Sequence, residues 1–168
     1  VNVCEPVVPD IETEPETPLD EPENVGADIE PDGVTVAEPP VAPKVEYVLF
    51  TPIQGQISSL FDPGQKHFGV DVPAKTNTPV KAISDGRVLF SEWTIDTGFV
   101  LIIEHSFNLI SVYKHNSLGL SSQGDFVKAG QAIALSGNTG ELSTGPHLHF
   151  ELWNDGNPVD PLEYISFE

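Results

Sequence analysis

The sequence predicts a mostly antiparallel β domain of about 120 residues that follows an acidic, proline-rich tail. Two observations predict the domain. Short apolar or alternating runs are separated by Gly, Asp and Asn turn residues, and no window of a dozen residues has a helical period. A third observation, an abrupt change in composition near residue 44, predicts the tail.

The tail comprises residues 1–44 and the domain residues 45–168. The tail holds 12 of the 26 acidic residues and 9 of the 16 prolines, with Lys44 as its only basic residue and no aromatic residue. Such a segment cannot bury enough apolar area to offset its ordering entropy, so we expect it to be disordered. It would serve either as a spacer between the domain and an anchor or as a solubilising tail.

Cys4 is the only cysteine, so the chain can form no internal disulfide. It is either a lipidated anchor or a free thiol, and Val3 stands where bacterial lipoproteins carry a small residue. No apolar run reaches the ~20 residues of a membrane-spanning helix, so membrane attachment is expected only through such an N-terminal anchor. The absence of methionine suggests a processed or truncated chain.

The formal net charge of −19 argues against nucleic acid as a partner, because a nucleic-acid-binding surface needs a basic footprint. The same charge argues against adhesion to an anionic membrane surface. An acidic surface suits a substrate with free amino groups, although acidity also serves solubility.

Within the domain the turn residues divide the chain into short strands. Asp85-Gly86 predicts one hairpin, and Asn154-Asp155-Gly156-Asn157 predicts another. Residues 164–167 are expected to cap the sheet. Strands are predicted, in chain order, at 45–50, 57–61 (a short strand or a turn), 80–83, 87–93, 99–104, 109–115, 132–135 and 147–152.

The last of these strands carries the strongest chemical signal. His147, His149 and Glu151 alternate with an apolar set, so the two histidines leave one face of a sheet with Cα atoms about 6.5–7 Å apart. At that spacing one imidazole can bind a metal while the other reaches the metal's water or the substrate. The alternative is two histidines on a solvated sheet face.

The domain contains all five histidines and no cysteine, so a metal site must use His with Asp or Glu. His67 and Asp71 are separated by three residues. An extended strand would place them about 13 Å apart, too far to share a metal. A helix would bring them together but is disfavoured by Gly69 and Pro73, whereas a bent strand or loop around Gly69 would also serve.

Several ordered motifs between about residues 53 and 167 resemble the lysostaphin-type (LytM-like) zinc metallopeptidases that cut peptidoglycan peptides. The motifs are, in chain order, His67-x-x-x-Asp71 with Gly69 between them, Thr78-Pro79-Val80, Asp85-Gly86-x-Val88, Tyr113-Lys114-His115, Gly137-Asn138-Thr139-Gly140 and Ser143-Thr144-Gly145-Pro146-His147-Leu148-His149-Phe150-Glu151.

The resemblance implies that His67, Asp71 and His149 bind one Zn²⁺ in an open groove across the sheet, with His115 and His147 as catalytic residues. Two neutral imidazoles and one carboxylate leave the ion a net charge of +1, which suits activation of water and polarisation of a peptide carbonyl. One histidine would be the general base and the other would stabilise the oxyanion, and the sequence leaves both assignments open.

Three other positions each have two interpretations, whereas His105 has one. Glu151 either orients a ligand imidazole or is a solvated carboxylate. Tyr113, which shares the parity of His115, either reaches the cleft or packs in the core. His105 is expected to be structural, with a hydrogen bond to a neighbouring strand. Residues 143–145 either shape the cleft or only form a turn.

Two residues depart from the family pattern. Asn77 stands where glycine is common, and Asn116 stands where leucine is common. Neither removes a ligand or a proton-transfer group.

The resemblance implies a bacterial endopeptidase, periplasmic or extracellular, whose partners are peptidoglycan stem peptides or cross-links. A non-catalytic module that binds the wall and activates a separate amidase is the alternative. Members of that kind usually lack some of the five positions, all of which are filled here. A metallopeptidase that acts on extracellular proteins is a third reading.

Overall fold

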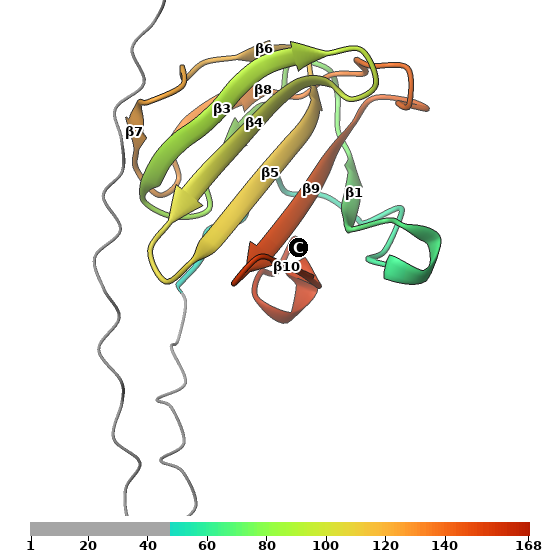
Figure 1. Ribbon diagram of the computed structural model, residues 1–168. Coiled ribbons are helices and arrows are strands. Elements are labelled where there is room, and N and C mark those ends of the chain that lie inside the picture. Colours follow the sequence, from blue (N-terminus) through green and yellow to red (C-terminus); the bar gives the residue numbers. More distant parts are fainter. Residues whose placement is uncertain (1–47) are drawn as a thin grey trace, which may run out of the picture. The chain divides into compact units, whose positions relative to one another are not determined.

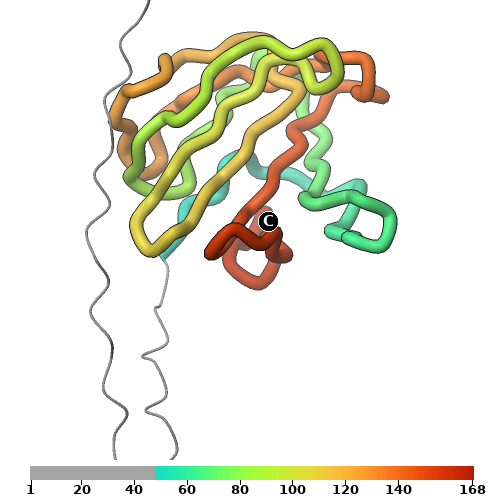
Figure 2. The backbone as a smooth tube through the Cα atoms, viewed as in Figure 1, coloured from blue at the N-terminus to red at the C-terminus, as the bar shows by residue number. Residues whose placement is uncertain are grey.

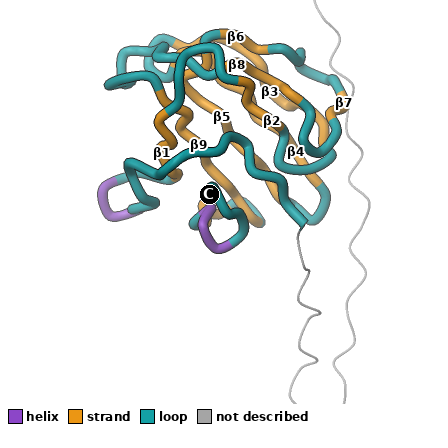
Figure 3. The backbone as a smooth tube through the Cα atoms, turned by 180° about the vertical axis from the view of Figure 1, so that it is seen from behind, coloured by secondary structure: helices purple, strands orange, loops and turns teal. Residues whose placement is uncertain are grey.

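Residues 48–168 are described by the computed structural model, and they form antiparallel β-sheets with two short 3₁₀ helices, Pro63–Gln65 and Pro161–Glu163 (Figures 1 and 3). The predicted mostly β fold is confirmed. The predicted tail, with Cys4, lies outside the described residues. No helix in residues 48–168 is long and apolar enough to cross a membrane.

The larger sheet supplies the surface on which the site is built. Its central strands lie side by side as one curved layer (Figure 1). Its strands, in spatial order, are β1 (Gly69–Pro73), β9 (His147–Asn154), β5 (Leu109–Asn116), β4 (Gly98–His105), β3 (Gly86–Thr94) and β7 (Phe126–Val127), with β10 (Asn157–Val159) also paired to β9.

The β4–β5 hairpin shows how local sequence sets these pairings (Figure 2). Phe107 and Asn108 at its tip have φ of 61° and 56°. Consecutive left-handed residues match the twist of the flanking strands, and asparagine tolerates that conformation well.

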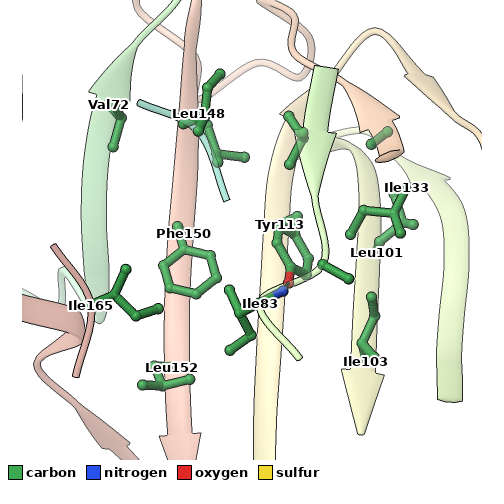
Figure 4. Packing of buried hydrophobic residues seen from close by; sticks show 14 of the residues in the cluster. Val72, Ile83, Leu101, Ile103, Tyr113, Ile133, Leu148, Phe150, Leu152 and Ile165 are labelled. Atoms are coloured by element: carbon green, nitrogen blue, oxygen red, sulfur yellow. Dashed lines mark hydrogen bonds between the residues drawn. The ribbon is translucent and has the colours of Figure 1, made fainter. Parts of the chain in front are cut away.

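A second, smaller sheet consists of β2 (Pro79–Lys81), β8 (Ala132–Leu135) and β6 (Leu118–Gly119). The core contains fully buried side chains from both sheets, and Figure 4 shows how they interlock. The large sheet contributes Leu101, Ile103, Tyr113, Leu148, Phe150 and Leu152, and the small sheet contributes Val80, Ile133 and Ala134. The apolar parity predicted for the last long strand is therefore confirmed.

The structure differs from the predicted strands in several places: β2 ends at Lys81, residues 57–61 form only an isolated bridge at Ser59, and β6 and β7 are additional short strands. Gly69–Pro73 is a strand that the sequence left open between a bent strand and a loop. Of the strand predicted at 45–50, residues 45–47 lie outside the described residues, and residues 48–50 form no strand, although the Phe50 amide donates to the Ile83 carbonyl at 2.7 Å. Residues 164–167 also form no strand, but Ile165 and Phe167 are buried in the core. Single backbone hydrogen bonds and side-chain burial hold these segments without a full ladder.

Asn77 has φ of 68°, which explains the first departure from the family pattern. Glycine is preferred in the left-handed region, and asparagine is among the residues that tolerate it. The Asn77 Oδ1 also accepts a hydrogen bond of 2.9 Å from the Ser117 hydroxyl.

A buried polar chain crosses the core beneath β4 and β5. His105 Nδ1 donates to the Asp85 carbonyl at 2.9 Å, and its Nε2 lies 2.7 Å from the Ser111 hydroxyl. That hydroxyl lies 3.0 Å from the Tyr113 hydroxyl, which also accepts from the Ile83 amide at 3.3 Å. The structural role expected for His105 is confirmed, and Tyr113 faces the core.

We predict that His105 makes the stability depend on pH. Burial lowers the pKa of His105, against a hydrogen bond and a charge from Asp85 that raise it. The unfolded chain therefore takes up the proton first, so this contribution is complete above about pH 6.5 and declines below it.

Urea unfolding at successive pH values tests this prediction. Between about pH 7 and 5 the free energy of unfolding should fall more steeply in the wild type than in His105→Gln, by at most about 1.4 kcal/mol per pH unit. Parallel curves would show that His105 does not titrate differently in the folded state.

Candidate metal centre and groove

Four imidazoles meet at one end of the large sheet, and each has one nitrogen tied to a protein oxygen. The Nδ1 atoms of His67, His115 and His147 lie 2.7, 2.8 and 2.7 Å from the carbonyl oxygens of Leu60, Thr139 and Gly145. His149 is tied at the other nitrogen, with Nε2 3.1 Å from a Glu151 carboxylate oxygen. In a neutral ring, a nitrogen that donates leaves the other as a bare acceptor. Nε2 is therefore the bare nitrogen of His67, His115 and His147, whereas both nitrogens of His149 contact carboxylates, because its Nδ1 lies 2.7 Å from Asp71 Oδ1.

His67, Asp71 and His149 offer ligand atoms that all lie within 4.8 Å of one another. Asp71 Oδ1 is 2.7 Å from His149 Nδ1, and Asp71 Oδ2 is 3.3 Å from His67 Nε2. The pairing of β1 with β9 produces this meeting, because it places Asp71 directly opposite His149. Gly69 permits the approach of the two strands: a Cβ there would lie 2.3 Å from the Phe150 carbonyl oxygen.

His67 reaches Asp71 because the chain bends before β1 begins. The first 3₁₀ helix is followed by its C-cap Lys66, which has φ of 60°, and His67 pairs through its backbone with Asp62. The bend removes the 13 Å separation that a continuous strand would impose. The bent arrangement around Gly69 is therefore the alternative that the structure adopts.

His115 and His147 face the same groove but are outside the cluster of three. His147 Nε2 is 3.7 Å from Asp71 Oδ1, and the His115 and His147 ring centroids are 4.8 Å apart. His147 comes from β9, two residues before His149, as the alternation predicts. His115 comes from the end of β5.

His115 reaches the groove through a break in the strand alternation. Its φ is 62°, and the β4–β5 register shifts between Phe99 and Leu101. Lys114 faces the groove, as the normal alternation along β5 places it. His115 follows it in the left-handed conformation, which turns its side chain to the same side. Tyr113 therefore faces the core, although it has the same parity as His115 in the sequence.

Asn116 holds this break in place. Its side chain is fully buried, and Nδ2 donates to the carbonyls of Phe99 and Tyr113 at 3.1 and 3.0 Å. The Thr139 hydroxyl donates to the Asn116 carbonyl at 2.6 Å, while the Thr139 carbonyl accepts from His115. The second departure from the family pattern thus stabilises the backbone that presents His115.

The electrostatics of the cluster favour an ionised carboxylate at Asp71. Burial by itself would raise the pKa of Asp71, but the hydrogen bond and charge of His149, with the charges of His147 and His67, hold it below its usual value. Burial would lower the pKa of His149, and hydrogen bonds to Asp71 and Glu151 raise it instead. Burial lowers the pKa of His115, which favours its neutral form.

The donor set fits a zinc ion. Zinc takes imidazole nitrogen and carboxylate oxygen, and three protein ligands leave a position for water. His67 Nε2 is a buried nitrogen with no hydrogen-bond partner among the described residues. Its lone pair is therefore available to bind a cation. The nitrogens and oxygens of these three residues are also close enough to converge on one ion.

The groove around the cluster has a volume of about 340 Å³. Leu142 and Thr144 line one side, with Lys66 and Phe68 among the other lining residues. A larger hollow of about 940 Å³ lies between residues 54–60 and 162–168, but it holds no histidine. The concentration of titratable groups identifies the smaller groove as the candidate site.

Sequence reasoning missed three contributors. Trp153 continues the alternation of His147, His149 and Glu151, so parity could have revealed it. Lys114 forms an ion pair with Glu151 from the neighbouring strand, and Thr139 anchors His115 from a loop. Their roles depend on strand pairing and loop placement, which local sequence does not show.

Comparison with known proteins agrees with this geometry. The model of peptidase family M23 matches residues 65–161, more than half of the chain. The chain belongs to peptidase family M23. The matched span includes all five residues of the groove that the sequence had singled out for metal binding and catalysis.

Relatives in this family have different described roles. Over 117 residues the chain is 38% identical to the peptidoglycan DD-endopeptidase ShyB of Vibrio cholerae, covering 64% of this chain and 27% of that protein. Over 98 residues it is 39% identical to the murein hydrolase activator EnvC of Escherichia coli, covering 58% of this chain and 23% of that protein. The chain thus spans about a quarter of the length of these two relatives.

Solved structures confirm the fold. A zinc-containing peptidase from Vibrio cholerae superposes with a TM-score of 0.65 at 37% identity, covering 68% of this chain and 39% of that one. The catalytic domain of lysostaphin from Staphylococcus simulans gives a TM-score of 0.56 at 32% identity, covering 68% of this chain and 88% of that one.

We predict that Asn116→Leu lowers the free energy of unfolding by about 1–3 kcal/mol, because the Phe99 and Tyr113 carbonyls lose a buried donor. Denaturant unfolding measures the change. Asn157→Leu is the matched control, since Asn157 is exposed and should change stability by no more than about 0.5 kcal/mol. An equal effect at both positions would contradict the role of Asn116.

Proposed function

We propose that the chain is a zinc endopeptidase that hydrolyses peptide bonds in peptidoglycan stem peptides or cross-links. The observation that carries the proposal is the arrangement of four tethered imidazoles around one carboxylate. All four rings line a single groove, and the Nδ1 bonds of His67, His115 and His147 leave their Nε2 atoms as acceptors. A purely binding module has no chemical need for that arrangement.

His67, Asp71 and His149 would hold Zn²⁺ as the metal ligands. When bound, the ion would polarise a peptide carbonyl and lower the pKa of a water molecule. His115 and His147 would act as the catalytic residues. Because their Nδ1 atoms are committed to carbonyl oxygens, each can take up a proton at Nε2 and return it to the leaving amine.

The hydrogen bonds at Nδ1 also determine that Nε2 is the atom that exchanges the proton. A ring whose Nδ1 donates to a backbone carbonyl cannot rotate without breaking that bond, so Nε2 of His115 and His147 stays directed at the groove. Once protonated, the same atom becomes a donor and can stabilise an oxyanion. The pair therefore supplies both functions, whichever ring acts first.

Names of relatives support the choice of substrate. The similarity to a protein described as a peptidoglycan DD-endopeptidase suggests cell-wall peptides, and an open groove on a sheet suits an extended peptide. We place the protein in the bacterial envelope, periplasmic or extracellular, on the same basis. Attachment to a membrane through the N-terminus is part of this proposal.

The second candidate function is activation of a separate cell-wall amidase, which the similarity to EnvC supports. An activator needs an intact binding surface and no proton transfer. Substitution of a catalytic histidine separates the two functions, because only the peptidase would lose its effect on the wall.

We predict that the zinc-loaded protein converts cross-linked muropeptides of purified sacculi to monomers. His147→Ala or His115→Ala should slow this reaction by about 10²–10⁴-fold, the usual contribution of a positioned proton-transfer group. Mass spectrometry of the released muropeptides measures the rate and identifies the bond.

Glu104→Gln is the control, because Glu104 is an exposed carboxylate on β4 outside the groove lining. A chelator-treated sample should be inactive. If none of the samples cleaves sacculi while the protein still binds them, the endopeptidase proposal fails and the activator function is favoured. Cleavage of glycine-rich proteins alone would instead indicate an extracellular protein substrate.

We also predict that zinc raises the thermal unfolding temperature of the wild type. A ligand at about 100 times its dissociation constant adds about 2.7 kcal/mol to the folded state. Asp71→Ala should abolish the shift, whereas Asp96→Ala, which removes an exposed carboxylate, should retain it. A zinc-dependent shift that persists in Asp71→Ala would place the ion elsewhere.

A further inference from the structure

Glu151 is a buried carboxylate beside the cluster. It is only 5% exposed, which rules out the solvated reading of this residue. A buried charge is costly unless it is paired and hydrogen-bonded, so its partners have to account for it.

Three side chains form hydrogen bonds or an ion pair with the Glu151 carboxylate. His149 Nε2 lies 3.1 Å from Oε1, and Lys114 forms an ion pair with the same oxygen. Trp153 Nε1 donates to Oε2 at 2.8 Å. The ion pair with Lys114 and the hydrogen bond from Trp153 supply the partners that a buried carboxylate needs.

The sheet places these groups together. His149, Glu151 and Trp153 are alternate residues of β9 and share one face, and Lys114 of β5 lies opposite His149. Lys114 reaches Glu151 along the diagonal between the strands, which is within range of a long side chain. The Phe68 ring, next to His67, packs on Trp153 with centroids 6.1 Å apart.

The consequence for His149 follows from its two nitrogens. Nδ1 lies 2.7 Å from Asp71 Oδ1, inside the cluster, and Nε2 lies 3.1 Å from Glu151 Oε1, outside it. A neutral ring that binds a metal through Nδ1 carries its one hydrogen on Nε2, where the Glu151 carboxylate accepts it. Rotation of the ring would break the bond to Glu151, so the carboxylate fixes both the tautomer and the direction of the ligand atom.

We propose that Glu151, held by Lys114 and Trp153, is a positioning residue that fixes His149 as a metal ligand through Nδ1. The three residues form the Glu151 cradle. This inference rests on the proposed zinc site. Lys114 balances the carboxylate charge, so the cradle acts through orientation and not by adding negative charge to the groove.

The test is zinc affinity, measured on the full chain by competition with a chromophoric chelator. Glu151→Asp keeps the charge but shortens the reach to Nε2, and it should weaken zinc binding about 10- to 100-fold. Glu151→Gln keeps the length and an acceptor oxygen, so it should lose less. An effect of charge alone predicts the reverse order, with Glu151→Asp close to wild type.

Two further variants keep the test decisive if Glu151 variants fold poorly. Trp153→Phe keeps the ring and every charge but removes the donor to Oε2, and it should weaken zinc binding several-fold. Glu104→Gln, which removes an exposed carboxylate from the same sheet face, should leave it unchanged. The unfolding temperature of each metal-free variant reports stability separately.

A spectroscopic readout completes the test. Two-bond ¹H–¹⁵N correlations should show His149 of the zinc-loaded wild type protonated at Nε2, and Glu151→Asp should mix the tautomers. Zinc affinity within twofold of wild type in both Glu151→Asp and Trp153→Phe would overturn the cradle. Failure of the wild type to bind zinc would instead overturn the proposed function.

Discussion

The site depends on the antiparallel pairing of β1 with β9. This pairing sets Asp71 opposite His149, and it joins two segments that are 78 residues apart in the chain. The opposite faces of the same strands are fully buried in the core, including Val70, Val72, Leu148 and Phe150. A slip of β1 by one residue would move Val70 and Val72 to the groove and Asp71 to the core. Hydrophobic packing therefore holds the ligands in register.

The second constraint is the commitment of one nitrogen of each imidazole. Histidine can present either ring nitrogen, and a flexible surface histidine presents both. In the groove, three rings are tied to backbone carbonyls and one to a buried carboxylate. The carbonyl acceptors thus set the tautomers of His67, His115 and His147 before a metal or substrate arrives, and little reorganisation of these rings remains at the moment of reaction. The cost is the buried Nε2 of His67, which has no hydrogen-bond partner within residues 48–168 and which a bound cation would satisfy.

The charge of the groove differs from that of the whole chain. The chain carries −19, yet the groove lining contains Lys66 and Lys114 against Asp71 and Glu151. The lining is balanced, and Lys114 pairs directly with Glu151. The excess negative charge lies outside the groove. A preference for amino groups on the substrate would therefore have to arise from the surrounding surface.

The sequence by itself determined the β class, the apolar and polar faces of the last long strand, and the identity of five residues that meet in the groove. These features are local: alternation with a period of two and short ordered motifs can be read without knowing the fold. The sequence also indicated a structural role for His105, since it follows an apolar strand.

Tertiary structure decided how these residues meet. The bend that brings His67 to Asp71 depends on the turn before β1 and on the space that Gly69 leaves beside Phe150. His115 points to the opposite side from Tyr113 because the register of β5 against β4 shifts near the end of the strand. The partners of Glu151 come partly from another strand. Each of these depends on which strand lies beside which, and that is determined by the packing of the whole domain.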